Sequence, residues 1–210
     1  MKIAISGAHG VGKTQLARKL AEALGLPIID EVARTVAQQM GIKSCADILA
    51  QLDAGKWGAV LKYQHKIITA QIQAERATDW ISDRSVMDIA GYIHLYATLI
   101  ADKKQRKSAL IDAKTYSEGI MPLTRKYDAI VYVPVPRGLQ AAEDDGFRLT
   151  AYQAELDKIL RGLLKKAECM VIRLPRVDVG ERDKWVDYAI RRIDNVKKMG
   201  KTVRRRDSEG

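Results

Sequence analysis

A segment that can hold phosphate groups lies near the amino terminus, where residues 7–14 read GAHGVGKT. The glycines allow the backbone to turn its N–H groups inward and to form a concave site for an anion. Lys13 can reach the β- and γ-phosphates of a nucleotide, and the hydroxyl of Thr14 can bind Mg²⁺. This spacing therefore predicts a site for ATP and Mg²⁺, with Lys13 in the catalytic machinery and Thr14 as a metal ligand.

The expected nucleotide-binding residues are those of this loop together with the residue that follows it. A helix that begins near Lys13 directs the positive end of its dipole at the same anion. His9 has two interpretations, since it can neighbour the phosphate or base, or it can be a loop side chain without a role. We expect nucleotide contacts from Gly7, His9, Gly10, Val11, Gly12, Lys13, Thr14 and Gln15.

Acidic side chains follow two further short apolar segments. Glu31 lies in the sequence DEVAR at 30–34, and Asp83 opens the sequence DRS at 83–85. In an open parallel sheet the carboxyl ends of the strands line the ligand crevice, so both carboxylates are expected beside the phosphates. Each could take a proton from an acceptor hydroxyl or hold the metal, which leaves the choice of base open. Glu31 has a second interpretation, as an acid stabilised by a helix N-terminus.

Five short apolar runs are the expected strands that position these residues. Each run is mostly hydrophobic on both sides, as in strands that are buried on both faces of a sheet. The expected strands are 2–6, 27–30, 80–82, 129–134 and 169–174. Helical spacing of apolar residues predicts helices at 14–24, 60–76, 86–100, 151–166 and 182–198, and at least two helices, one near 47–52, between the second and third strands.

Strands that alternate with helices predict an α/β fold, a three-layer sandwich of about five parallel strands with helices on both faces. The chain has 210 residues and no linker rich in proline, glycine or serine, so we expect a single domain over residues 1–198. Residues 199–210 are expected to be a basic, flexible tail.

Composition excludes several classes of protein. Hydrophobic residues make up 47% of the chain and charged residues 30%, as in a globular protein. No apolar run approaches the ~18–20 residues that cross a bilayer, and the amino terminus lacks a signal-peptide pattern. Two distant cysteines are expected to be reduced thiols, so we expect a cytoplasmic protein without a membrane partner.

Aromatic residues make up only 6% of the chain, too few for a platform that stacks several bases of a single strand. Tyr63, Trp57, Tyr92 and Tyr96 cluster where an acceptor is expected, and one or two of them could stack on a ring. Tyr92 and Tyr96 are spaced by one helical turn, which favours a core position for this pair.

The net charge of +10 is concentrated in two places. Residues 191–210 contain eight basic side chains and three acidic ones, and a second basic cluster lies at 103–107. Such clusters attract polyanions such as nucleic acid, but they also occur as solvated surfaces. The charge leaves both interpretations open, with DNA as a candidate partner.

At its motifs the chain resembles the P-loop nucleoside and nucleotide kinases, which include deoxynucleoside kinases, thymidylate kinases and ribosylnicotinamide-kinase-like ATPases. The matching segments are GAHGVGKT at 7–14, DEVAR at 30–34, DRS at 83–85 and DDGFR at 144–148. The resemblance implies that Glu31 is the catalytic base. It also implies that Asp83 lies near the metal and that Arg84 contacts phosphate or acceptor.

The resemblance also implies an arginine-bearing lid near residues 136–150. An arginine that closes over the transferred phosphoryl group stabilises its negative charge. Arg148 lies in a polar, glycine-containing stretch suited to a hinge, whereas Arg137 follows Pro136 and is a more rigid alternative. We expect Arg148 to act in catalysis.

These observations predict a kinase that transfers the γ-phosphoryl group of ATP to a hydroxyl of a nucleoside-type acceptor. The acceptor could be free, or it could be a hydroxymethylated base within DNA, which the basic charge favours. The alternative is a nucleic-acid-associated ATPase without a specific acceptor. An oligomer is compatible with either function.

Overall fold

A five-stranded parallel sheet forms the centre of the computed structural model, which describes residues 1–139 and 150–208. The strand order is β2-β3-β1-β4-β5, and each neighbouring pair runs parallel. The predicted α/β fold is therefore confirmed. The strands are β1 (Lys2–Ser6), β2 (Ile28–Ile29), β3 (Trp80–Asp83), β4 (Ala129–Tyr132) and β5 (Met170–Arg173).

The central strand β1 is apolar on both sides because both of its edges are paired and both of its faces are covered. Its apolar residues are fully buried, which explains the continuous apolar run in this segment. Ile5 pairs with Asp83 of β3, and Ser6 pairs with Tyr132 of β4. The carboxyl ends of these three strands therefore meet at one edge of the sheet, where the predicted site residues lie.

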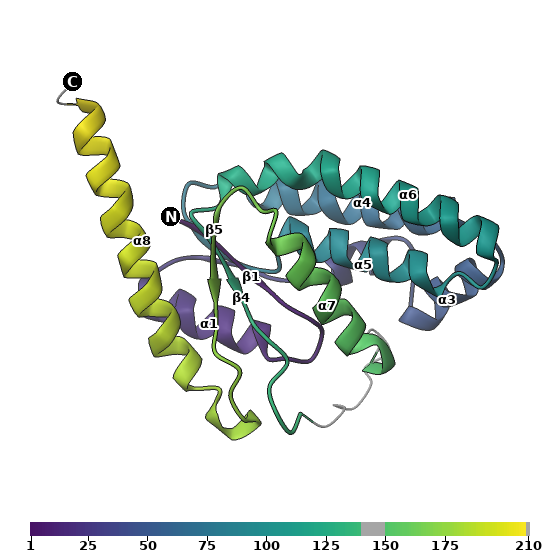
Figure 1. Ribbon diagram of the computed structural model, residues 1–210, viewed down its shortest axis with the longest axis horizontal. Coiled ribbons are helices and arrows are strands. Elements are labelled where there is room, and N and C mark those ends of the chain that lie inside the picture. Colours follow the sequence, from purple (N-terminus) through teal and green to yellow (C-terminus); the bar gives the residue numbers. More distant parts are fainter. Residues whose placement is uncertain (140–149, 209–210) are drawn as a thin grey trace.

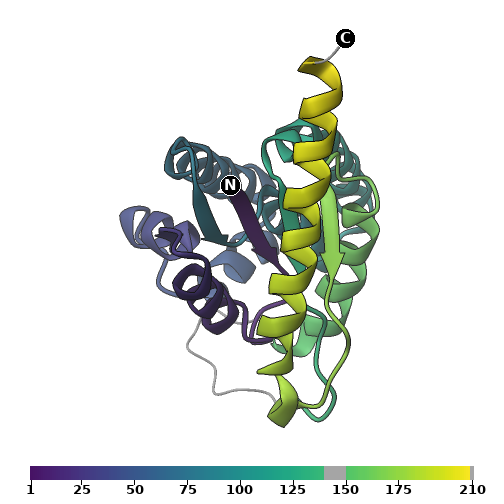
Figure 2. The same ribbon diagram turned by 90° about the vertical axis from the view of Figure 1, so that its left-hand side faces the viewer.

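Eight α-helices surround the sheet in the described part of the chain (Figure 1). They lie on both sides of the strands in the turned view (Figure 2). Helices α1 and α8 contact each other and the sheet, whereas α4, α6 and α7 pack against α5. The helices are α1 (Lys13–Leu24), α2 (Val32–Gln39), α3 (Cys45–Asp53), α4 (Trp57–Ala74), α5 (Val86–Leu99), α6 (Lys103–Ile120), α7 (Gln153–Leu164) and α8 (Lys184–Ser208), with 3-10 turns η1 (Met121–Lys126), η2 (Thr150–Tyr152) and η3 (Val179–Glu181).

Capping boxes begin two of the described helices. The Ser85 hydroxyl accepts a hydrogen bond from Met87 N at 3.1 Å, and the Asp88 carboxylate accepts one from Ser85 N at 2.9 Å. Ser44 and Asp47 form the same reciprocal cap at α3. Because a capping box fixes the point where a loop becomes a helix, the start of α5 after β3 is held in place.

Most of the expected elements are present with shifted ends, but two helices were not expected from the sequence. Helix α2 has only eight residues and begins within the acidic motif after β2. Helix α6 includes the basic cluster at 103–107, and its buried side is made mostly of small residues such as Ala109 and Ala113. A stripe of small side chains gives only a weak helical pattern of hydrophobic residues, so the sequence of this segment shows its charges more clearly than its helix.

The first half of α8 packs on the sheet through Trp185, Ala189 and Ile193, which are buried at every fourth residue. The helix then continues to Ser208 and extends beyond the other elements (Figure 1). The expected tail at 199–210 is thus helical in its backbone up to residue 208, and the domain boundary at 198 stays a prediction. Among the described helices, none combines the length and the apolar character that crossing a membrane requires.

Candidate active site

The phosphate-binding loop connects β1 to α1, and its conformation depends on glycine. A Cβ placed on Gly7 would lie 2.5 Å from the carbonyl oxygen of Val133, so no larger residue fits there without a shift. Gly12 precedes α1 with a φ of +102°, and no side chain in the described residues caps the helix at this position. The first N–H groups of α1 are therefore left to bind an anion.

Lys13 is the buried cation of this loop. Its Nζ donates a hydrogen bond to the carbonyl oxygen of Ala8 at 2.6 Å, which folds the side chain back over the loop. Burial and, to a lesser extent, the nearby charge of Arg84 lower the pKa of Lys13 to about 8, against the opposite effect of Asp88, Asp83 and Glu31. An anion bound in the loop would favour the charged form of this lysine.

Thr14 and Asp83 bring two oxygen ligands together from α1 and β3. The Thr14 hydroxyl donates to Asp83 Oδ2 at 2.5 Å, and Asp83 is buried at the end of its strand. Within the described residues, no group of three or more acidic, histidine or cysteine side chains is arranged to hold a metal. A hydroxyl and one carboxylate instead fit Mg²⁺, which takes oxygen ligands and shares them with substrate phosphates.

Glu31 is held by two arginines at the start of α2. Arg84 Nε lies 2.6 Å from Glu31 Oε1, and Arg34 Nε lies 3.5 Å from Oε2. Burial by itself would raise the pKa of Glu31, but the charges of Arg84 and Lys13 lower it below its ordinary value. The carboxylate is therefore ionised at neutral pH. Glu31 is also the residue that precedes α2, which agrees with the interpretation as an acid at a helix N-terminus, while its role as a base stays a prediction.

Arg84 occupies an unusual backbone conformation beside Glu31. It has a φ of +113°, which is rare for residues other than glycine and is found where the surroundings impose it. Its guanidinium contacts Glu31, lies 3.9 Å from Asp88 Oδ1 and stacks over the ring of Tyr92 at 5.4 Å. Three neighbours thus fix the direction of this arginine.

Asp88 was not among the predicted site residues, although it connects the two motifs. Its Oδ1 accepts a hydrogen bond from Gly7 N at 3.1 Å, while Oδ2 caps α5 through Ser85. This fully buried carboxylate therefore ties the beginning of the phosphate loop to the DRS turn. The spacing Ser85-x-x-Asp88 is a capping-box signal in the sequence, but the contact with Gly7 depends on the fold.

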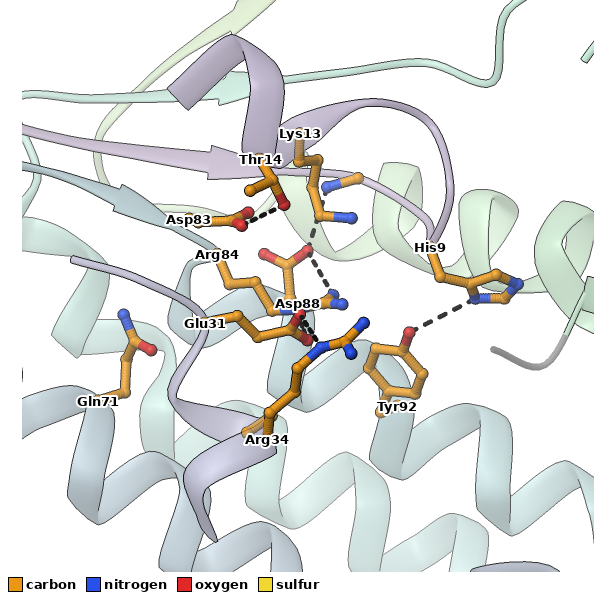
Figure 3. Close-up of polar contacts among 12 residues, drawn as sticks. His9, Lys13, Thr14, Glu31, Arg34, Gln71, Asp83, Arg84, Asp88 and Tyr92 are labelled. Atoms are coloured by element: carbon orange, nitrogen blue, oxygen red, sulfur yellow. Dashed lines mark hydrogen bonds and ion pairs between the residues drawn. The ribbon is translucent and has the colours of Figure 1, made fainter. Parts of the chain in front are cut away.

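Two cavities share residues of this group. Figure 3 shows how Glu31, Arg34 and Arg84 lie relative to Lys13, Thr14 and Asp83. The phosphate cavity is lined by the loop and by Asp83, and the second one, the acceptor cavity, lies between α2, α3, α4 and α5. Glu31, Arg34 and Arg84 line both cavities. A group bound in one cavity can therefore reach a group bound in the other at Glu31 and Arg84.

The acceptor cavity has a mixed lining of aliphatic, aromatic and polar side chains. Its side chains include Cys45, Tyr63, Gln64, Gln71, Tyr92 and Tyr96. Tyr96 is buried in the core as expected, whereas Tyr92 is partly buried against it, and both also line this cavity. Trp57 instead donates from Nε1 to Asp112 at 2.9 Å, away from the cavity lining.

The loop residues contribute to the phosphate cavity in different ways. His9, Gly10, Gly12, Lys13, Thr14 and Gln15 line it. Val11 is fully buried and, like Gly7, supports the loop from the core side. The Nδ1 of His9 lies 3.4 Å from the hydroxyl of Tyr92, and Gln153 donates to the His9 carbonyl oxygen at 2.6 Å. His9 thus joins the loop to α5 and α7.

Two arginines bear on the expected lid, one outside the described residues and one beside the phosphate loop. Arg148, with residues 140–149, lies outside the described residues, so its catalytic role stays a prediction. Arg182, which the sequence did not single out, lines the phosphate cavity from the turn after β5. Its Nη1 would lie 3.2 Å from a Cβ at Gly12, and its Nε donates to Val179 O at 3.0 Å. Nothing in the local sequence signals this contact, because the two segments meet only in the fold.

Comparisons with known proteins agree with this arrangement. Residues 2–182 match the family described as AAA domain. The fold is similar to deoxyadenosine kinase from M. mycoides with bound dCTP (TM-score 0.61, 18% identity, 93% of this chain and 100% of that chain). It is also similar to the NadR protein in complex with NR (TM-score 0.50, 19% identity, 93% of this chain and 50% of that chain). No curated protein matches the sequence significantly. The chain therefore belongs to the AAA domain family, and its fold is that of the P-loop nucleoside and nucleotide kinases.

Proposed function

We propose that this protein is a kinase that transfers the γ-phosphoryl group of ATP to a hydroxyl of a free, nucleoside-type acceptor. The contact between the two cavities at Glu31 and Arg84 is the observation that carries this proposal. A nucleotide hydrolase needs a phosphate site and a water, whereas a second cavity beside the phosphates suits a second substrate. The similar fold of a deoxyadenosine kinase adds support at the level of the fold alone.

Donor binding is assigned to the loop and its two nearest partners. The backbone N–H groups before α1 and the Lys13 ammonium would bind the β- and γ-phosphates. Thr14 Oγ1 and the Asp83 carboxylate would hold Mg²⁺. When bound, this ion neutralises phosphate charge and orients the phosphates.

Proton transfer is assigned to Glu31. As the acceptor oxygen forms its bond to the γ-phosphorus, the bond from that phosphorus to the bridging oxygen of ADP breaks, and the hydroxyl proton passes to the Glu31 carboxylate. Glu31 is ionised and faces both cavities, which suits a group that orients and deprotonates the acceptor. Asp83 faces only the phosphate cavity and is bonded to Thr14, so we assign it to the metal rather than to the proton.

Charge stabilisation is assigned first to Arg84. Its guanidinium is already fixed at the junction of the cavities, where the transferred phosphoryl group would pass. A preorganised cation at that point stabilises the charge spread over the equatorial oxygens without reorganising during the reaction. Arg148 remains a proposed second cation, and Arg182 is a neighbour of the loop that could contact the nucleotide.

A hydroxymethylated base within DNA is the second form of acceptor that the sequence suggests. The basic residues of α8 favour binding to a polyanion. A base in a duplex would have to leave the stack to enter a cavity lined by residues of four helices, which costs unpairing energy. A free nucleoside does not incur this cost, which favours a free acceptor over the polymer.

An acceptor screen with γ-labelled ATP and Mg²⁺ tests the proposal. The panel contains free ribonucleosides and 2′-deoxynucleosides, and single- and double-stranded DNA with 5-hydroxymethyluracil. Label on a free nucleoside is expected, and it should be lost with Glu31→Gln. Label on DNA alone would replace the free acceptor with the polymer. Phosphate release that needs no acceptor and survives Glu31→Gln would instead identify an ATPase.

A further inference from the structure

The start of α5 carries most of the groups that surround Arg84. Arg84 lies two residues before this helix, and two of its three neighbours, Asp88 and Tyr92, are on the first two turns. The capping box of Ser85 and Asp88 fixes the local shape of the turn, but both of its members belong to the same segment. The location of Arg84 relative to the sheet therefore depends on what ties the start of α5 to other elements.

One such tie comes from Tyr127, a buried residue between η1 and β4. Its hydroxyl accepts a hydrogen bond at 3.1 Å from the N–H of Val86, the first residue of α5. The first N–H groups of a helix find no acceptor within it, so a buried one needs an acceptor from another element. The Tyr127 ring packs edge-on against the ring of Trp80 at 5.7 Å, which holds it on β3. Tyr127 thus connects the start of α5 to the sheet.

Glu75, at the end of α4, determines which way the Tyr127 hydroxyl points. Glu75 is only 3% exposed, and the hydroxyl lies 3.1 and 3.2 Å from its two oxygens. Burial raises the pKa of Glu75, but an ion pair with Lys126 favours its charged form. A carboxylate only accepts hydrogen bonds, so the hydroxyl donates to Glu75 and accepts from Val86. Burial and the charge of Glu75 raise the pKa of Tyr127 well above its ordinary value, so this proton stays in place.

A second tie joins the same turn to the phosphate loop, through the hydrogen bond from Gly7 N to Asp88 at 3.1 Å. The two ties leave the helix start in different directions, and Arg84 lies between them with a φ of +113°. Residues keep such a rare conformation only where the surrounding structure imposes it. Loss of the tie to Tyr127 is therefore expected to let Arg84 relax and move its guanidinium.

We propose that Tyr127 is a positioning residue for phosphoryl transfer, which acts through the N–H of Val86 to hold Arg84 at the junction of the two cavities. This inference rests on the proposed kinase function. Tyr127 is not among the described residues that line either cavity, so its effect passes through α5. A cation that is no longer preorganised stabilises the transferred phosphoryl group less, and we expect a loss of about tenfold in kcat.

Two variants remove the same hydrogen bond from opposite sides. Tyr127→Phe removes the acceptor and keeps the ring, whereas Val86→Pro removes the donor. Proline is tolerated as the first residue of a helix, and Ser85 before it already has an extended conformation with a ψ of 168°. Each variant should lower kcat about tenfold, and the double variant should lie within about twofold of either one. The Kd for ATP should change less than about threefold, because the donor side keeps its backbone contacts.

Combination with Arg84→Gln separates positioning from a general effect on the fold. In this background Tyr127→Phe should lower kcat less than about twofold, because the group that it positions is gone. Single-turnover transfer from γ-labelled ATP measures the slow variants. A loss by the same factor in both backgrounds would show a purely structural role and overturn the inference. A kcat within twofold of wild type in folded Tyr127→Phe would overturn it as well.

Tyr116→Phe is the matched control, since the buried Tyr116 hydroxyl has no hydrogen-bond partner among the described residues, and it should keep the wild-type kcat. Unfolding midpoints show whether each variant is folded, and Val86→Pro carries the test if Tyr127→Phe is not. Hydrogen exchange of the Val86 amide should be faster in Tyr127→Phe, which reports the lost tie without turnover. Failure of the wild-type protein to phosphorylate any acceptor, with ATP binding intact, would overturn the kinase proposal and this inference with it, an outcome distinct from equal losses in the two backgrounds.

Discussion

The two adjoining cavities of the site are built in different ways. The phosphate cavity is built around the backbone N–H groups and side chains of one continuous loop, with charged side chains from β3 and three other segments at its border. The acceptor cavity is lined by side chains from four helices and the turn after β3. Backbone groups cannot be exchanged by substitution, whereas the side chains of four helices can. The donor side is therefore constrained to one chemistry, and the acceptor side is where specificity can vary.

Removal of the Lys13 side chain is the strongest test of the donor side. Lys13→Ala is expected to lower kcat about 10³-fold, because the charge that binds the β- and γ-phosphates is lost. Transfer from labelled ATP measures this effect. Lys19→Ala is the control, since Lys19 lies on the exposed side of the same helix and pairs with Asp183. Retained activity in Lys13→Ala would contradict the assignment of the loop.

Loss of the Glu31 carboxylate should affect transfer to the acceptor more than binding of the donor. Glu31→Gln is expected to lower kcat about 10²-fold, because the acceptor hydroxyl loses its base. The Kd for ATP should change less than threefold, since the donor side keeps its backbone contacts. Steady-state rates and equilibrium binding separate the two effects, with the exposed Glu22→Gln as control. A large loss of ATP affinity would mean that the two cavities are not separable.

Gly7→Ala tests the backbone basis of the donor side. The new Cβ would meet the Val133 carbonyl oxygen at 2.5 Å, so the loop or β4 must move. We expect the free energy of unfolding to fall by about 1–3 kcal/mol and ATP binding to weaken. Denaturant unfolding measures the change. Gly58→Ala has no heavy atom within 4 Å of its new Cβ and should not destabilise the protein.

The titration of Lys13 should change ATP binding less than the removal of its side chain. Burial and Arg84 lower the pKa of this residue to about 8 in the free protein, so the charged form is lost above that pH. The affinity for ATP should fall by up to about tenfold per pH unit above pH 8. Equilibrium binding from pH 7 to 9.5 measures this slope. Lys13→Arg, which stays charged, should remove it, and a flat profile in the wild-type protein would contradict the shift.

The lowered pKa of Lys13 also determines how the free energy of unfolding changes with pH. The unfolded chain holds the Lys13 proton up to a pKa of 10.5, whereas the folded protein releases it near 8. The unfolded state therefore binds more protons between these values, and the contribution of Lys13 to the free energy of unfolding rises with pH in that window.

The difference between the cavities also explains how much could be read from the sequence. The phosphate loop was predictable because its residues are contiguous and their types are dictated by backbone chemistry. Asp83 and Glu31 were predictable because parallel strands end at a common edge. Arg182 and Tyr127 gave no signal, since the first reaches the loop from a distant turn and the second meets Val86 only in the fold. Contacts of this kind are set by tertiary packing.

The uncapped start of α1 at Gly12 has a consequence for how the protein is best prepared. A helix whose first donors have no internal partner is incomplete, and a bound polyphosphate would supply the missing acceptors. Ligand that binds only the folded state adds stability by mass action, about 2.7 kcal/mol at a concentration one hundred times Kd. Purification and crystallisation with a non-hydrolysable nucleotide should accordingly give a more stable and better ordered sample than the nucleotide-free protein.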